Sequence, residues 1–190
     1  MSAAGRVMAA AVALLGAWPA PAAPAPAFLS GRAPSEYQVK AAFLYHFAQL
    51  VEWPAGKGGA IAPPFDIGLL GDDVFAGALE RAIDGKTVHQ RRLRFRRYED
   101  LEAVRKSPPQ VLFVALSDAR AAQQVLQALA DAPVLTVSDL EGFADQGGMI
   151  GFRITPEGRV GFDINHGRVQ RAGLRMSSQL LKLARIVGRP

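Results

Sequence analysis

SEYQVKAAFLYHFAQLVEWP, residues 35–54, is the longest strongly patterned segment of the chain and is rich in aromatic side chains. Its apolar residues recur at helical spacing, which predicts an amphipathic helix that ends at Trp53-Pro54. The face they share consists of Val39, Phe43, Phe47, Leu50 and Val51. Because this face is wide and aromatic, the rest of the chain has to cover it.

Local chemistry marks the start of this helix. Pro34 disfavours helical backbone before it, and Ser35 can accept a hydrogen bond from an orphan N–H of the first turn. Gln38 stands three residues on and completes a capping box. Glu36 and Lys40 form an i,i+4 pair in the favourable order, so the first turns are predicted with residue precision.

The overall composition is that of one globular domain. The chain has 190 residues, 49% of them hydrophobic and 21% charged, with a formal net charge of +5. It contains no cysteine, which excludes disulfides, iron–sulfur clusters, thiolate zinc sites and thiol nucleophiles. The modest positive charge suits an anionic partner but is also common on proteins that bind none.

The first residues resemble a secretory leader. Arg6 is the only charge among residues 1–31, residues 7–18 are apolar, and small-x-small cleavage sites follow. The apolar core is too short to span a bilayer, which takes about 20 residues. The alternatives are an uncleaved anchor or a disordered cytosolic tail. The pattern predicts export to the periplasm of a Gram-negative bacterium and no membrane span in the mature chain.

These features divide the chain into three parts. We expect a signal peptide over residues 1–22, with cleavage as late as residue 27, and a Pro/Ala/Gly linker over 23–34. A single domain follows over 35–190, with a loop at Gly56–Gly59.

The middle of the chain alternates between strand and helix patterns. The expected strands cover residues 65–70, 91–98, 111–116, 134–137, 149–154 and 160–164, the last two joined by a turn at 156–158. We expect helices over 74–83 (capped by Asp72), after Ser117 or Asp118, and in the last segment, where Met176, Leu180, Leu183, Ala184 and Val187 would share a side. This order predicts a three-layer α/β sandwich with a mixed, mainly parallel sheet, an antiparallel C-terminal hairpin and a final helix.

The search for catalytic or metal-binding groups finds no matched set. Gly68–Gly71 lacks the remaining residues of a phosphate loop, so a plain turn is the better interpretation. His46, His89 and His166 have no metal-ligand spacing, and Asp72-Asp73 suits a helix start. We therefore predict no enzyme, no metal and no cofactor.

The most distinctive charged segment is RRLRFRR, residues 91–97. On a strand, Arg92, Arg94 and Arg96 share one face, and Leu93 and Phe95 share the other. Two interpretations are open for the arginine face. It could contact a phosphate, an anionic glycan or an acidic partner; the favoured interpretation is an edge strand whose charges prevent aggregation. Nucleic acid is not expected, because this face has no aromatic residues that could stack on bases.

Three groups of residues resemble the YfiR family. The matching positions are Glu36, Tyr37, Lys40, Phe43, Tyr45, Trp53 and Pro54 in the first group; Thr136, Gly147 and Gly148 in the second; and Asn165, Ser177, Ser178, Gln179 and Leu180 in the third. The residues themselves suggest structural roles: Gly147 and Gly148 permit a tight or left-handed backbone, and Asn165 can cap a following helix.

The resemblance implies a non-enzymatic α/β regulator in the periplasm. It would dock on the periplasmic domain of an inner-membrane diguanylate cyclase or sensor kinase, lower cyclic di-GMP and restrain biofilm formation. Characterised members carry cysteines linked to redox control, and this chain has none, which excludes thiol redox sensing. A homodimer and a small-molecule ligand are further expected partners.

Two other hypotheses stay open. The first is a periplasmic module that binds a small ligand or a cell-wall fragment, which predicts a closed pocket with convergent polar groups. The second is an exported hydrolase, which would need an acid, base or nucleophile that the sequence does not supply as a set.

Overall fold

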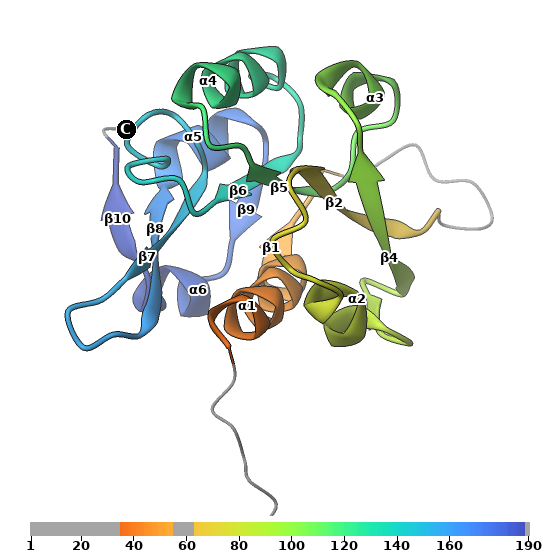
Figure 1. Cartoon of the computed structure of the whole chain (residues 1–190), viewed down its shortest axis with the longest axis horizontal. Coiled ribbons are helices and arrows are strands. Elements are labelled where there is room, and N and C mark those ends of the chain that lie inside the picture. Colours follow the sequence, from red (N-terminus) through yellow and green to blue (C-terminus); the bar gives the residue numbers. More distant parts are fainter. Residues whose placement is uncertain (1–34, 55–62, 189–190) are drawn as a thin grey trace, which may run out of the picture. The chain divides into compact units, whose positions relative to one another are not determined.

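The protein is described by a computed structural model for residues 35–54 and 63–188 (Figure 1). The expected leader, the linker and the Gly56–Gly59 loop lie outside these ranges. The described elements, in order, are α1 (Glu36–Leu50), β1 (Val51–Glu52), β2 (Phe65–Gly71), α2 (Ala78–Ile83), β3 (Thr87–Val88), β4 (Arg91–Tyr98), α3 (Leu101–Lys106), β5 (Val111–Ala115), α4 (Ala119–Ala128), β6 (Leu135–Ser138), β7 (Ile150–Ile154), β8 (Val160–Asn165), α5 (His166–Arg171), β9 (Arg175–Met176), α6 (Ser178–Leu183) and β10 (Arg185–Val187).

Eight of the strands form one mixed sheet in the order β10-β8-β7-β6-β5-β2-β4-β3. Its pairs are parallel except β7–β8 and β3–β4. Helices α1, α2 and α6 lie on one face, and α3 and α4 on the other (Figure 1). The predicted α/β sandwich, its mainly parallel sheet and its C-terminal hairpin are confirmed.

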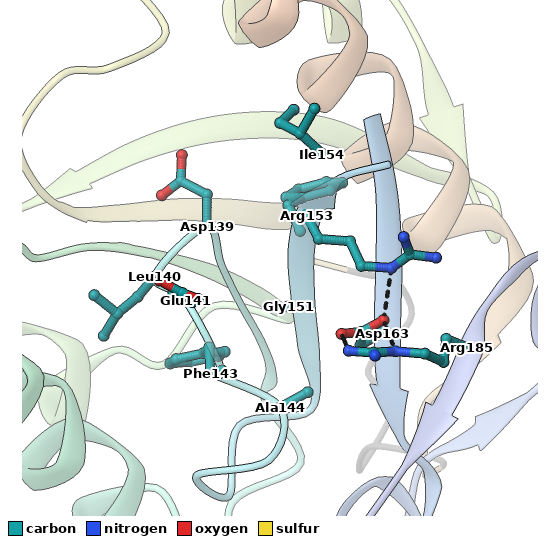
Figure 2. Close-up of a pocket in the computed structure, with 12 residues that line it drawn as sticks. Asp139, Leu140, Glu141, Phe143, Ala144, Gly151, Arg153, Ile154, Asp163 and Arg185 are labelled. Carbon is teal, nitrogen blue, oxygen red and sulfur yellow. Dashed lines mark hydrogen bonds and ion pairs between the residues drawn. The ribbon is translucent and has the colours of Figure 1, made fainter. Parts of the chain in front are cut away.

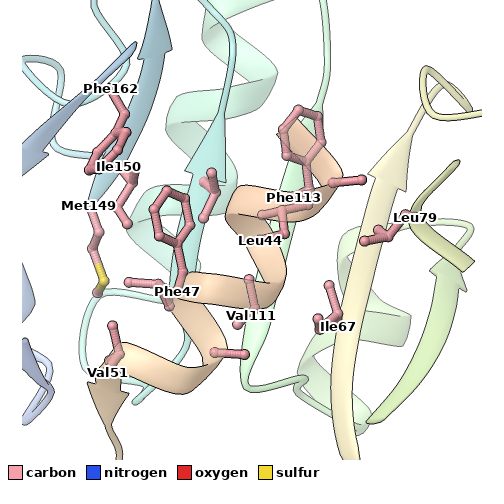
Figure 3. Close-up of a cluster of buried hydrophobic side chains, with 14 of the residues drawn as sticks. Leu44, Phe47, Val51, Ile67, Leu79, Val111, Phe113, Met149, Ile150 and Phe162 are labelled. Carbon is pink, nitrogen blue, oxygen red and sulfur yellow. The ribbon is translucent and has the colours of Figure 1, made fainter. Parts of the chain in front are cut away.

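Apolar side chains on both faces of the sheet form two clusters. The larger lies against α1 and includes Leu44, Phe47, Ile67, Phe113 and Ile150 (Figure 3). The smaller lies against α3 and α4. Strand β5 contributes to both because successive side chains alternate between faces, which explains why it is apolar throughout.

Helix α1 begins as predicted but ends earlier. The Ser35–Gln38 capping box is present, and Lys40 Nζ lies 2.5 Å from Glu36 Oε1. The helix stops at Leu50 rather than Trp53, because Val51 and Glu52 form β1, which pairs with β9 in an antiparallel two-stranded sheet.

The buried face of α1 is wider than predicted. Phe47 and Val51 are fully buried, but so are Ala41, Leu44 and Ala48, and Lys40 is only 3% exposed. The expected face members Val39, Phe43 and Leu50 are partly buried. The helix therefore packs around most of its circumference.

Two other helix predictions are corrected. Helix α2 begins at Ala78, not at residue 74, because Ala76 (φ 46°) and Gly77 (φ 78°) adopt left-handed backbone. Asp73, rather than Asp72, accepts a hydrogen bond from an N–H of this turn, that of Ala76.

The final segment does not form one helix. Helix α6 ends at Leu183, and β10 then pairs in parallel with β8. Leu183 is 66% exposed instead of sharing a buried side. Pairing with β8 satisfies backbone groups that a longer helix would have bonded internally. Helix α3, capped by Asp100, was not predicted, whereas Asn165 caps α5 as expected.

Candidate functional site

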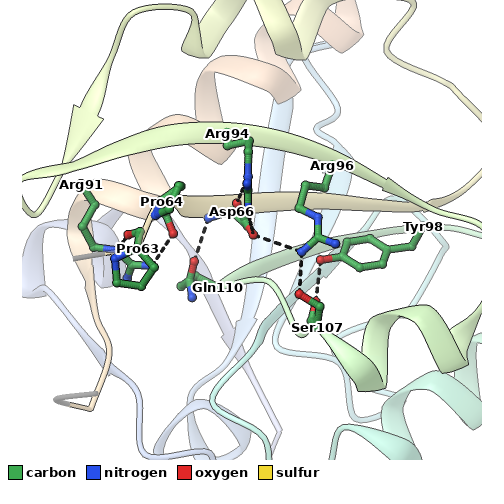
Figure 4. Close-up of polar contacts among 9 residues, drawn as sticks. All are labelled: Pro63, Pro64, Asp66, Arg91, Arg94, Arg96, Tyr98, Ser107 and Gln110. Carbon is green, nitrogen blue, oxygen red and sulfur yellow. Dashed lines mark hydrogen bonds and ion pairs between the residues drawn. The ribbon is translucent and has the colours of Figure 1, made fainter. Parts of the chain in front are cut away.

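Strand β4 carries the arginine stripe next to β2. Asp66 of β2 stands directly opposite Arg94, whose Nε and Nη2 donate to its two carboxylate oxygens at 2.7 and 2.8 Å. Arg96 Nη1 donates to Asp66 Oδ2 at 3.3 Å and to Ser107 Oγ at 2.6 Å (Figure 4). The two guanidiniums share one carboxylate, so the group keeps one positive charge.

The arginine stripe faces solvent only in part, whereas the sequence predicted that all three side chains would be exposed. Arg92 and Arg94 are exposed, but Arg96 is partly buried. Its Cζ lies 5.0 Å from the centroid of the Tyr98 ring. Leu93 and Phe95 pack against the larger core cluster, as the alternation predicts. Strand β4 is not the outermost strand, because β3 pairs with Arg91 and Arg92.

Hydrogen bonding to Asp66 raises the pKa of Arg94 above its ordinary value. Arg94 is therefore charged at every physiological pH. The side chain of Asp66 is only 10% exposed. This buried carboxylate holds the guanidiniums of both Arg94 and Arg96 in place. The arrangement presents ordered guanidinium donors at the surface.

A second carboxylate shared by two arginines lies at the other end of the sheet. Arg153 Nε of β7 and Arg185 Nε of β10 both donate to Asp163 Oδ1 of β8 at 2.9 Å. They line a pocket of about 340 Å³ between these strands and the 139–144 segment. In the view of Figure 2, Asp139 and Glu141 lie on the opposite side of Gly151 from this arginine pair.

Asp139 connects this pocket to the first helix. Its Oδ2 accepts from Lys40 Nζ at 2.7 Å and from Tyr37 Oη at 3.0 Å. Burial alone would lower the pKa of Lys40, but hydrogen bonds to Asp139 and Glu36 outweigh it and raise the pKa. Burial, together with the hydrogen bond to Asp139, also raises the pKa of Tyr37. Lys40 is thus a charged, buried connection between α1 and the pocket.

A shallow apolar groove of about 510 Å³ lies between α1 and the β7–β8 hairpin. Val39 and Phe43 line one side, and Ile154 and Val160 line the other. Ile154 is 52% exposed and also borders the charged pocket. Neither this groove nor the charged pocket can be inferred from local sequence patterns, because both are formed by segments far apart in the chain.

The other positions of the family resemblance have structural contacts. Gly147 has φ 100°, and a Cβ added at Gly148 would overlap with atoms of the Phe143 ring. Thr136 Oγ1 accepts from the N–H of Met149, and Trp53 Nε1 donates to the carbonyl of Gln110.

The remaining positions stabilise local packing. Ser177 caps α6, which Ser178 and Gln179 begin, and Leu180 is 1% exposed. Lys86 Nζ lies 4.1 Å from the centroid of the Tyr45 ring, and Pro54 lies beside Gly173. Of these residues, Tyr37 and Lys40 contact Asp139 of the charged pocket, and Glu36 pairs with Lys40.

The histidines lie apart, as their spacing suggested. His89 Nε2 lies 3.1 Å from the carbonyl oxygens of both Ala48 and Val51. Within residues 35–54 and 63–188, no three His, Asp or Glu side chains are grouped as a metal site. None of the helices in these same ranges is both long enough and apolar enough to cross a bilayer.

No curated protein matches the chain. A family model described as YfiR/HmsC-like matches residues 37–185, which is most of the chain. The protein therefore belongs to the YfiR/HmsC-like family.

Proposed function

We propose that this protein is exported and docks on the periplasmic domain of an inner-membrane diguanylate cyclase, where it lowers cyclic di-GMP output and restrains biofilm formation. Family membership supports a periplasmic, non-catalytic regulator of diguanylate cyclase in general. The finer steps, which are docking, repression and the biofilm response, are our proposal. The proposal includes a leader over residues 1–22 and a linker over 23–34.

The observation that carries the docking step is the arginine surface of Arg92, Arg94 and Arg96, two of whose side chains are held by Asp66. Asp66 holds Arg94 and Arg96 in place, so their side-chain entropy is already reduced before a partner binds. Ordered guanidiniums suit carboxylates on an acidic partner surface. We propose an acidic patch on the cyclase's periplasmic domain as the complement.

The energy required of such a regulator is small. The protein has only to bind the inactive state of the cyclase more tightly than the active state. A difference of about 1–3 kcal/mol shifts the equilibrium between these two states roughly 5- to 150-fold. A modest charged interface can supply this difference without any catalytic group.

The proposal is tested first in cells. The tagged full chain is exported, crosslinked and recovered from membranes, and cyclic di-GMP is measured in a deletion strain. Recovery of a membrane cyclase together with a raised nucleotide level in the deletion strain is the expected result. Capture of a sensor kinase instead would move the partner to that class. An unchanged nucleotide level with no captured signalling protein would refute the proposal.

The docking surface is tested with substitutions that respect the ion pairs. Reversing all three charges would place new carboxylates beside buried Asp66, so we prefer Arg92→Glu with Arg94→Gln. This variant should bind the captured partner at least tenfold more weakly, with a reduced salt dependence. Arg120→Glu with Arg171→Gln, at exposed positions on α4 and α5, changes the net charge equally; it is the matched control and should bind normally. Equal affinity of the two variants would exclude the arginine surface.

The charged pocket favours a second function that is compatible with the first. A module for a small ligand or a cell-wall fragment requires a cavity with convergent polar groups, and this pocket has both arginines and carboxylates in its wall. A homodimer remains a proposal without a specific surface.

A further inference from the structure

The pocket beneath the 139–144 segment has two poles of opposite charge. On the strand side, Arg153 and Arg185 share Asp163, and two guanidiniums with one carboxylate leave one positive charge. On the other side, the wall contains Asp139 and Glu141. Figure 2 shows these poles separated by the backbone of Gly151.

The positive pole keeps unused donors. Arg153 gives only its Nε to Asp163, and its terminal amino groups make no hydrogen bond with the residues that the structure describes. Its side chain is 36% exposed, so these amino groups are anchored through Nε and open to solvent. A guanidinium with a free edge is a good partner for a carboxylate.

The negative pole also keeps unused acceptors. Asp139 receives both its hydrogen bonds on Oδ2, which leaves Oδ1 without a donor among the described residues. Glu141 is exposed and has no ion pair within residues 35–54 and 63–188. A ligand ammonium placed near these two carboxylates would be stabilised by both.

Apolar groups line the wall between the poles. Leu140, Phe143, Phe152 and Ile154 line the pocket together with the charged groups, and its volume of about 340 Å³ lies at the lower end of the range for small-molecule sites. The complement of such a wall is a short hydrocarbon chain with a charge at each end.

We propose that this pocket binds a small zwitterion whose ammonium and carboxylate are separated by a hydrocarbon spacer. Its carboxylate pairs with Arg153, and its ammonium lies between Glu141 and Asp139. Neither pole alone accounts for recognition, because each is partly neutralised within the protein, by Asp163 on one side and by Lys40 on the other.

The same contacts give such a ligand a route to α1. An ammonium at Asp139 competes with Lys40, which also contacts Glu36 in the first turn of the helix. Glu36 lines the apolar groove, and Ile154 lines both the groove and the pocket, so a change at Lys40 would reach the wall of the groove through Glu36. The idea that such a ligand is the regulator's input signal rests on the proposed function. The binding site itself does not rest on it.

The test is calorimetric titration of the purified protein with zwitterions of increasing length: glycine, 4-aminobutanoate and 6-aminohexanoate. Hexanoate and hexylamine each lack one charge of the longest probe. We expect at least one of the two longer zwitterions to bind about tenfold or more tightly than either singly charged analogue. Equal binding of an analogue, or no binding of any zwitterion, would overturn the proposal.

Two variants place the binding in this pocket. Arg153→Gln leaves Arg185 on Asp163, and Glu141→Gln changes an exposed side chain, so both variants should fold. Each variant should weaken zwitterion binding about tenfold. Arg153→Gln should change the affinity for hexylamine less, and Glu141→Gln should change the affinity for hexanoate less. Arg120→Gln on α4 is the control. Affinity unchanged in both pocket variants would also contradict the site. Because no cyclase is present, failure here is distinguishable from failure of the proposed function.

Discussion

Lys40 and Asp139 are 99 residues apart in the sequence, yet Lys40 Nζ lies 2.7 Å from Asp139 Oδ2. The lysine side chain is 4% exposed and the aspartate side chain 24%. A single buried ammonium therefore joins the first helix to the segment that follows β6. Because Lys40 pairs with Glu36 of the groove and with Asp139 of the charged pocket, it is the best point at which to test how these parts depend on one another.

Lys40→Met should lower the free energy of unfolding by about 2 kcal/mol. The substitution keeps most of the buried stem but leaves Glu36 and Asp139 without their cation. Removing one partner of a fully buried pair costs about 3–5 kcal/mol, and the loss is smaller here because water reaches both carboxylates. Urea unfolding measures the change. Lys106→Met, at an exposed site on α3, should lose less than half as much.

The same lysine should make stability fall at alkaline pH. The folded pKa of Lys40 is raised, so its contribution is complete below the unfolded value of about 10.4 and is lost as the pH rises through the folded value. The raised pKa of Tyr37 acts in the same direction. Unfolding free energies at pH 8 to 11 should fall less steeply in Lys40→Met than in the native chain, and parallel curves would contradict this assignment.

Asp66→Asn should destabilise the arginine surface. Loss of the shared carboxylate leaves Arg94 and Arg96 without their ion pair, and we expect a loss of about 1–2 kcal/mol because the side chain of Arg94 is 52% exposed. Chemical denaturation measures it. Asp131→Asn, on the surface after α4, is the control and should change stability by less than about 0.5 kcal/mol.

Asp163→Asn should loosen β10 without unfolding the domain. The strand has three residues, pairs in parallel with β8, and is held additionally by the two hydrogen bonds from Arg185 to Asp163. We expect faster amide exchange at Ile186 and Val187, measured by mass spectrometry, with the protection of β5 unchanged. Unchanged exchange in β10 would show that backbone pairing alone holds it.

Gly148→Ala should be costly although the added group is a single methyl. The new Cβ would overlap the ring of Phe143, which is itself 1% exposed and cannot move freely. Overpacking of this kind costs about 1–3 kcal/mol. Thermal unfolding checks it against Gly85→Ala, where the added Cβ meets no atom within 4 Å and only the left-handed backbone, φ 67°, is strained. An equal loss at both positions would exclude steric overlap as the cause.

Features that depend on neighbouring residues were predicted well from the sequence. The Ser35–Gln38 capping box, the Asn165 cap and the hairpin between β7 and β8 are confirmed, and each involves residues a few positions apart. The buried strands were predicted because a run of apolar residues between turn signals is itself the local signal. The order of these elements was sufficient to predict the layered fold.

The local signals failed where a distant partner outweighed them. The pattern at Val51 continued a helix, but pairing with Met176 made it a strand, and the apolar spacing after Leu180 likewise continued past the residue where β10 begins. Helical periodicity also placed no lysine in the core. Lys40 is buried because two acids, one of them in a remote segment, compensate its charge.

Sequence alone was enough to predict the family resemblance, the α/β class and the alternation of Arg92, Arg94 and Arg96, because these follow from residue order and backbone periodicity. The tertiary structure decided which of those arginines is held by Asp66, and it formed the charged pocket from Asp139, Arg153 and Asp163. The physical reason is that ion pairs and cavities depend on distances in space, and the acids concerned stand 28 and 99 residues from Arg94 and Lys40 along the chain.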